Sequence, residues 1–289
     1  MSRIKILVCC HKPSAIPDDP MYLPVQVGKE IAKQDLGIQG DNEPDSDDVR
    51  RISRLNPVYC EMTAMYWAWK NIRKLYPDVR YVGLCHYRRY FNANDGKGKD
   101  LVIPALKKVR ESIRILAGRV RKITIYEPLE NIKSIHDRRF RNSNRKLKEI
   151  ILANEMVYTK PVNVLTGNVG MLFGIIGRTY LELLEEIIAS EYSDYRNLYK
   201  TVISNNEIIS SNMLVLKTDY LDDYCGFVFG VLNRHLELVR ERGICNDPEK
   251  EGAYARVSGY LAEILTHLYI SKKKNEIKSE AVRKFFVTT

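Results

Sequence analysis

Two apolar, β-prone runs on either side of an amphipathic helix constrain this chain more than any other feature. The runs cover residues 5–10 and 81–85, and the helical pattern between them begins at Asn56 and Pro57. Asparagine is a good N-cap and proline fits the first helical position, while apolar residues recur at helical spacing from residue 58 to residue 72. The order strand, loop, helix, strand predicts a βαβ unit with parallel strands.

Basic residues come directly after these strands and after a third predicted strand at residues 155–158. They are His11 and Lys12, then His86 with Arg88 and Arg89, and finally Lys160. Open α/β sheets bind ligands at the carboxyl ends of their strands, and a histidine beside paired arginines suits an anion such as phosphate. One such ending could be a solvated surface, but three together favour an anionic ligand.

The charge balance also indicates an acidic partner. The chain has 289 residues, enough for a sizeable core, and a formal net charge of +10. That excess would attract nucleic acid, nucleotide phosphates or an anionic membrane surface. Much of it lies between residues 107 and 148, which predicts a basic helical or half-ordered insertion, although a solvated face has the same composition. Lys272 begins a second basic stretch, predicted to be a solvated or membrane-facing tail.

The compartment follows from what the sequence lacks. Its longest apolar runs are too short to span a bilayer, and the first residues resemble a strand, not a signal peptide. The six cysteines are scattered without the paired spacing of a zinc site. We therefore expect reduced thiols in a cytoplasmic protein.

Three acidic residues are candidates for chemistry. Glu61 lies near the helix start among small neighbours that leave room for a ligand, although it could simply complement the helix dipole. Glu263 lies two turns after Arg256, so the two share roughly one face of a C-terminal helix, as a surface ion pair also would. Asp41 lies in a turn and could bind a ribose hydroxyl or a metal, but acids in turns are common.

Seven segments together match a family pattern. They are residues 10–13, 24–28, 40–42, 56–71, 81–91, 212–213 and 256–263. In these segments the chain resembles a family of bacterial capsular and exopolysaccharide glycosyltransferases that was formerly catalogued as a domain of unknown function. Characterised members are associated with galactofuranose transfer. The resemblance is close over the N-terminal third, good over the C-terminal quarter and poor from residue 101 to residue 210.

The resemblance implies a GT-A-like (Rossmann-like) α/β fold, with a mixed sheet flanked by helices and a basic helical insertion. Residues 1–289 would form one domain, in which 1–100 bind the nucleotide-sugar, 101–210 form a variable acceptor-side region and 211–289 a C-terminal helical part. The implied activity is transfer of a hexose, with galactofuranose the first candidate, from a UDP-sugar to a lipid-linked glycan in capsular, exopolysaccharide or O-antigen synthesis. The protein would touch the anionic inner face of the cell membrane peripherally.

Glycosyl transfer with inversion needs positive charge on the leaving diphosphate and a base for the acceptor hydroxyl. The candidate catalytic residues are Glu61, Glu263 and His86; the sequence does not separate the two glutamates as the base. The candidate donor-binding residues are His11, Lys12, Gln26, Asp41, Asn42, Arg88, Arg89, Asn212 and Arg256.

The metal requirement and two other function classes stay open. GT-A enzymes usually carry a DxD metal motif after a central strand, but here His86 to Arg89 occupy that place; the literal Asp45-Ser46-Asp47 follows no strand. Mn²⁺ or Mg²⁺, if used, would recruit Asp41 or Glu61. Basic residues interleaved with aromatics also fit a nucleic-acid-binding module, although no such signature is present and we expect no nucleic-acid partner. An inactive scaffold of a polysaccharide assembly complex would bind no donor.

Overall fold

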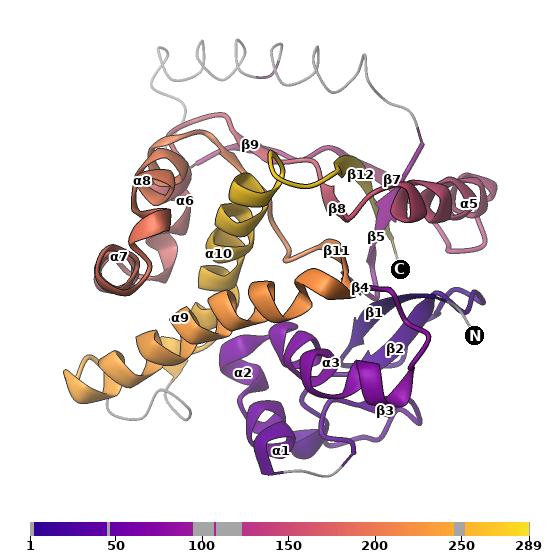
Figure 1. Cartoon of the computed structure of the whole chain (residues 1–289), viewed down its shortest axis with the longest axis horizontal. Coiled ribbons are helices and arrows are strands. Elements are labelled where there is room, and N and C mark those ends of the chain that lie inside the picture. The colour runs from indigo at the N-terminus through magenta and orange to yellow at the C-terminus, as the bar shows by residue number, and fades with distance from the viewer. Residues whose placement is uncertain (1–2, 45–46, 95–106, 108–122, 246–251, 289) are drawn as a thin grey trace.

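The computed structural model describes residues 3–44, 47–94, 107, 123–245 and 252–288 (Figure 1). Its strands are β1 (Ile4–Cys10), β2 (Tyr22–Gln26), β3 (Gln39–Gly40), β4 (Tyr81–His86), β5 (Arg89–Asn92), β6 (Ile125–Tyr126), β7 (Leu129–Ile132), β8 (Met156–Thr159), β9 (Val162–Val164), β10 (Glu207–Ile208), β11 (Leu214–Lys217) and β12 (Ser279–Val287). Its α-helices are α1 (Asp47–Arg54), α2 (Asn56–Tyr59), α3 (Met62–Leu75), α5 (Arg138–Ala153), α6 (Val169–Phe173), α7 (Arg178–Glu191), α8 (Arg196–Ser204), α9 (Leu221–Glu241) and α10 (Val257–Lys273).

The main sheet is mixed. β1 lies between β2 and β4 and runs parallel to both, which confirms the predicted βαβ unit. β5 and β11 both pair antiparallel with β4. Cys9 of β1 is in register with His86 of β4, so the polar residues that follow these two strands emerge side by side.

The strands of the sheet are buried on both faces. Leu7 and Cys9 of β1 belong to a core formed with α2, α3, α7, α9 and α10. The alternate residues Ile6 and Val8 face a second core that includes Phe140 of α5. Because successive strand residues point to opposite faces, helices cover both sides of the sheet, and the predicted mixed sheet flanked by helices is confirmed (Figure 1).

The predicted helix from Asn56 is in fact two helices. α2 ends at Tyr59, and Cys60 adopts a positive φ of 51° that no α-helix accommodates. The side chain of Asn56 stabilises the break, because its Nδ2 donates a hydrogen bond to the Cys60 carbonyl at 2.7 Å. Glu61 therefore precedes α3 as its N-cap residue and does not lie within a helix.

The middle and C-terminal regions differ from the sequence-based expectation. Residues 95–106 and 108–122 of the basic insertion lie outside the described residues, but α5 is a basic helix and β7 and β8 join the main sheet. The predicted C-terminal tail is wrong, because β12 follows α10 and pairs with β5, β7 and β8. Lys272 forms an ion pair with Asp194 of the chain itself. Within the described parts of the chain, we find no helix whose length and apolar character would let it span a membrane.

Candidate active site

A cavity of about 560 Å³ opens where β1 and β4 end, against the α2–α3 turn and the start of α10. Its volume is typical of a small-molecule site. The residues that line it are Cys9, His11, Val27, Asn56, Pro57, Cys60, Glu61, His86, Tyr87, Arg88, Arg89, Ser211, Arg256, Gly259, Tyr260 and Glu263. The carboxyl ends of parallel strands thus form one wall of the cavity, as the sequence predicted.

Backbone strain concentrates around this cavity. Among the described residues other than glycine, four have a positive φ, with values from 51° to 72°: Cys60, Ser211, Asn212 and Arg256. Three of them line the cavity, and the side chain of Asn212 bonds to a lining residue. A non-glycine residue pays free energy for this conformation, and such residues cluster at functional sites.

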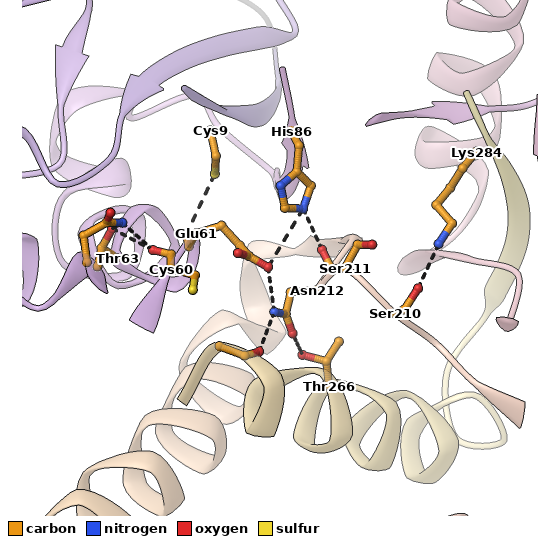
Figure 2. Close-up of polar contacts among 12 residues, drawn as sticks. Cys9, Cys60, Glu61, Thr63, His86, Ser210, Ser211, Asn212, Thr266 and Lys284 are labelled. Carbon is orange, nitrogen blue, oxygen red and sulfur yellow. Dashed lines mark hydrogen bonds and ion pairs between the residues drawn. The ribbon is translucent and has the colours of Figure 1, made fainter. Parts of the chain in front are cut away.

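A hydrogen-bonded network fixes the polar groups at the floor of the cavity (Figure 2). Nε2 of His86 lies 2.9 Å from the carbonyl oxygen of Ser211, to which it donates. Asn212 donates from Nδ2 to Oε1 of Glu61 at 2.9 Å, and its Oδ1 accepts from Thr266 at 3.1 Å. His86 Nε2 also lies 3.9 Å from the same Glu61 oxygen. The network orients one imidazole and one carboxylate toward the same space.

Three arginines give the cavity a positively charged wall. Arg88 stacks against the rings of Tyr87 and Phe286, with its guanidinium carbon 5.1 and 5.5 Å from the ring centres. Its Nε is buried and has no hydrogen-bond partner among the described residues. Arg89 and Arg256 line the same cavity. Guanidinium groups suit the oxygens of a phosphate, and the positive dipole ends of α3 and α10 add to the same field.

Two carboxyl groups share this cavity. Burial, together with the charge of Glu61, raises the pKa of Glu263 to about 7, while the Ser211 backbone, Lys284 and Arg89 oppose the rise. Glu263 thus exchanges its proton near neutral pH, which is the behaviour expected of an acid–base group.

Two other titratable groups at the site are neutral. Burial, aided by the charges of Lys12, Arg88 and His86, lowers the pKa of His11. Burial raises the pKa of the Cys60 thiol to about 12, so this thiol stays protonated and is no nucleophile.

The structure brings most of the predicted site residues together. Those that line the cavity are Glu61, Glu263, His86, His11, Arg88, Arg89 and Arg256. Asn212 is fully buried and does not line the cavity, but its hydrogen bond to Glu61 orients that carboxylate. Lys12 is exposed outside the lining, with its Nζ 5.5 Å from the Tyr87 ring centre. Lys160, although it follows a strand, does not line the cavity.

Gln26, Asp41 and Asn42, which were predicted to contact the donor, are not among the residues that line the cavity. Each instead forms hydrogen bonds with residues of the segments that follow β2, helix α1 included. Gln26 donates to the Gln34 carbonyl at 2.7 Å. The buried Asp41 carboxylate accepts from the Gly28 amide at 2.7 Å, as well as from the Lys29 amide and the Ser53 hydroxyl. Asn42 donates to Glu30 at 3.0 Å. Their polar groups stabilise local structure.

Several lining residues were missed by the sequence-based reasoning. Asn56, Pro57 and Cys60 were assigned to one continuous helix, so their position beside a ligand cavity was not expected. Gly259 was not singled out, yet a Cβ at this position would lie 2.8 Å from the Cys60 sulfur. Only glycine lets α10 approach the α2–α3 turn this closely.

The described residues include no group of three or more His, Cys, Asp or Glu side chains that could hold a metal ion. Glu61 and Glu263 are the two carboxylates in the cavity lining. Asp45 and Ser46 of the literal DxD lie outside the described residues, and Asp47 begins α1. Among the described residues, the cavity lining therefore contains no aspartate that could serve as a metal ligand in the manner of a DxD motif.

The chain is similar to a known protein family and to a solved structure. A family model described as DUF4422, a domain of unknown function, matches residues 5–275. A solved structure of the WbbM bifunctional glycosyltransferase in its apo form is similar, with a TM-score of 0.74 and 25% sequence identity. The match covers 99% of this chain but 45% of that one, so this chain spans less than half of WbbM's length. The search of curated proteins gave no match.

Proposed function

The chain belongs to the DUF4422 family, and from that premise we propose that it is a glycosyltransferase whose cavity binds the diphosphate of a nucleotide-sugar. The observation that carries the proposal is the convergence of three arginines, two histidines and two glutamates in one strained cavity at the ends of β1 and β4. The likeness to a bifunctional glycosyltransferase, of which this chain covers one part, supports it.

In this proposal the cationic wall binds the leaving group. As the bond between the sugar and the diphosphate breaks, negative charge grows on the phosphate oxygens, and preorganised positive groups stabilise that charge. Arg88, Arg89 and Arg256 supply permanent charge, and His86, whose Nε2 hydrogen already bonds to the Ser211 carbonyl, supplies a further donor only as the imidazolium, from Nδ1. A GT-A-like donor site at the strand ends would place the diphosphate against these groups.

We assign the base to Glu263. Glu61 accepts a hydrogen bond from Asn212 and Glu263 accepts one from the Ser211 backbone, so the assignment rests on the pKa of Glu263, which lies at about 7, near the value that suits a general base. The acceptor hydroxyl oxygen attacks the anomeric carbon, the bond from that carbon to the phosphate oxygen breaks, and the nucleoside diphosphate leaves with the electron pair. Glu263 takes the hydroxyl proton, and the attack from the opposite face inverts the configuration.

The finer features belong to the same proposal. The donor is a UDP-sugar, with galactofuranose the first sugar to test, and the acceptor is a lipid-linked glycan of capsular, exopolysaccharide or O-antigen synthesis. The basic surface, with its net charge of +10, would place the protein peripherally on the anionic inner face of the membrane. Transfer or hydrolysis measured across a panel of UDP-sugars identifies the donor.

We expect UDP at concentrations well above its Kd to raise the melting temperature of the purified protein by several degrees. A ligand that binds only the folded state at about 100 times its Kd stabilises that state by about 2.7 kcal/mol. The measurement is a thermal unfolding scan with UDP, with uridine as the control that lacks the diphosphate. A large shift with oligonucleotides and none with UDP would instead favour the nucleic-acid-binding alternative, and no shift with either would favour a scaffold.

We also expect turnover to persist in excess EDTA, with less than about a tenfold loss, because the arginines supply the charge that a metal provides elsewhere. The measurement compares initial rates before and after chelation and after Mn²⁺ or Mg²⁺ is restored. A loss that either metal reverses would contradict this expectation and return Glu61 to the role of a metal ligand.

A further inference from the structure

A lysine with no solvent exposure lies behind the cavity. Lys284 of β12 has 0% relative exposure, and lysine is almost never fully buried unless its charge is paired. Its ammonium group forms an ion pair with Glu127, between β6 and β7, and donates a hydrogen bond to the Ser210 hydroxyl at 3.1 Å. Lys284 is not part of the cavity lining, so any effect it has on the site passes through other residues.

The bond to Ser210 reaches the strained loop that precedes β11. Ser211 and Asn212, the next two residues, have φ values of 72° and 51°. Asn212 is held on the side of α10, where it donates to the Gly259 carbonyl and accepts from Thr266. Figure 2 shows Lys284 reaching Ser210 from the opposite side. The loop is thus fixed from both sides by buried groups, which is how a strained conformation persists.

This loop presents backbone groups to two proposed catalytic residues. The Ser211 carbonyl accepts from His86, and the Ser211 backbone forms a hydrogen bond that lowers the pKa of Glu263. The charged groups that act on Glu263 are Glu61, Lys284 and Arg89. Those that act on Lys284 are Glu127, Glu263 and Arg89. Lys284 is therefore joined to the site by a hydrogen bond through the loop and by its charge.

We infer that Lys284, paired with Glu127, is a positioning residue that fixes the loop Ser210–Asn212 so that His86 and Glu263 keep their places in the cavity. The inference rests on the proposed function for its catalytic meaning, but the positioning itself can be measured without turnover. Glu127 lies between β6 and β7, within the basic region of residues 107–148, so the pair also links that region to the loop Ser210–Asn212.

The decisive variant is Lys284→Met with Glu127→Gln, which removes both charges without leaving either one unpaired. Loss of the positive charge beside Glu263 should move the titration midpoint of Glu263 up by about 1 pH unit, followed by ¹³C-carboxyl NMR and assigned with Glu263→Gln. The amide resonance of Ser211 should shift as well. We expect kcat to fall by about tenfold with the KM for the donor nearly unchanged, because misplacement of catalytic groups costs rate.

Two further variants keep the test decisive. Ser210→Ala removes only the bond to the loop, so it should shift the imidazole resonances of His86, which donates to the Ser211 carbonyl, even where the double variant does not fold. Lys5→Met is the matched control: Lys5 is 9% exposed in β1, where it donates to the Pro20 carbonyl, and is not in the cavity lining. An unchanged Glu263 midpoint in the double variant, or unchanged His86 imidazole resonances in Ser210→Ala, overturns the inference. Shifted resonances in a protein that neither binds UDP nor transfers sugar would defeat the proposed function alone.

Discussion

Replacement of Glu263 with glutamine should lower turnover by about 10²- to 10⁴-fold, the usual contribution of a positioned general base. Glutamine keeps the shape of the side chain but cannot take the proton of the acceptor hydroxyl. Stabilisation by UDP should stay near the wild-type value, because the arginines that face the diphosphate are unchanged. The measurement is the initial rate at saturating donor, together with a thermal scan in the presence of UDP.

The dependence of the transfer rate on pH tests the same assignment of Glu263 as the base. The pKa of Glu263 is raised to about 7, and the base acts as the carboxylate, so the wild-type rate should rise as pH increases through 7 and level off above it. The charge of Glu61 contributes to that raised pKa; Glu61→Gln should therefore move the rise to lower pH. Glu280→Gln, at an exposed position of β12, is the control. Full activity of Glu263→Gln beside an inactive Glu61→Gln would reverse the assignment of the two glutamates.

Local patterns in the sequence predict those parts of the site that depend on residues close together in the chain. Apolar runs followed by His11 and by His86 predicted two adjacent strand ends, and the parallel register of β1 and β4 confirms them. The spacing of Arg256 and Glu263 predicted a shared helix face, and both residues line the cavity, but Arg256 precedes α10 as its N-cap residue with a φ of 65° and is not part of the helix. These features follow from strand and helix periodicity, which a single sequence contains.

The remaining features depend on contacts between distant segments, so no local pattern contains them. The break at Cys60 interrupts a sequence that fits a continuous helix, and α10 packs closely against the break at Gly259. Lys284 lies 74 residues from Ser210, in a segment that resembled a solvated tail. Asp41 looked available in a turn, but three donors from two other segments occupy its carboxylate. In each case, contacts between segments that are distant in the sequence determine the backbone conformation or the partner of the polar group.

Replacement of Arg88 with alanine should lower transfer by about 10²- to 10³-fold, the usual cost of removing one group that stabilises charge in the transition state. The guanidinium carbon lies 5.1 and 5.5 Å from the ring centres of Tyr87 and Phe286, its buried Nε has no partner among the described residues, and the side chain lines the cavity. Arg88→Lys should recover only part of the rate, because an ammonium group cannot bind two oxygens in the same plane. His86→Ala should also lose turnover while the protein remains folded.

The control for Arg88→Ala is Arg80→Ala, an exposed position immediately before β4, at the end of the strand opposite the cavity. Both variants lose one positive charge, so general attraction of an anionic donor to the basic protein falls equally in each. Of the two variants, only Arg88→Ala should also lose most of the stabilisation by UDP, because Arg88 faces the diphosphate in the proposed complex and Arg80 does not. Equal, small effects in the two variants would mean that net charge alone attracts the donor, and full activity in both Arg88→Ala and His86→Ala would remove these residues from the site.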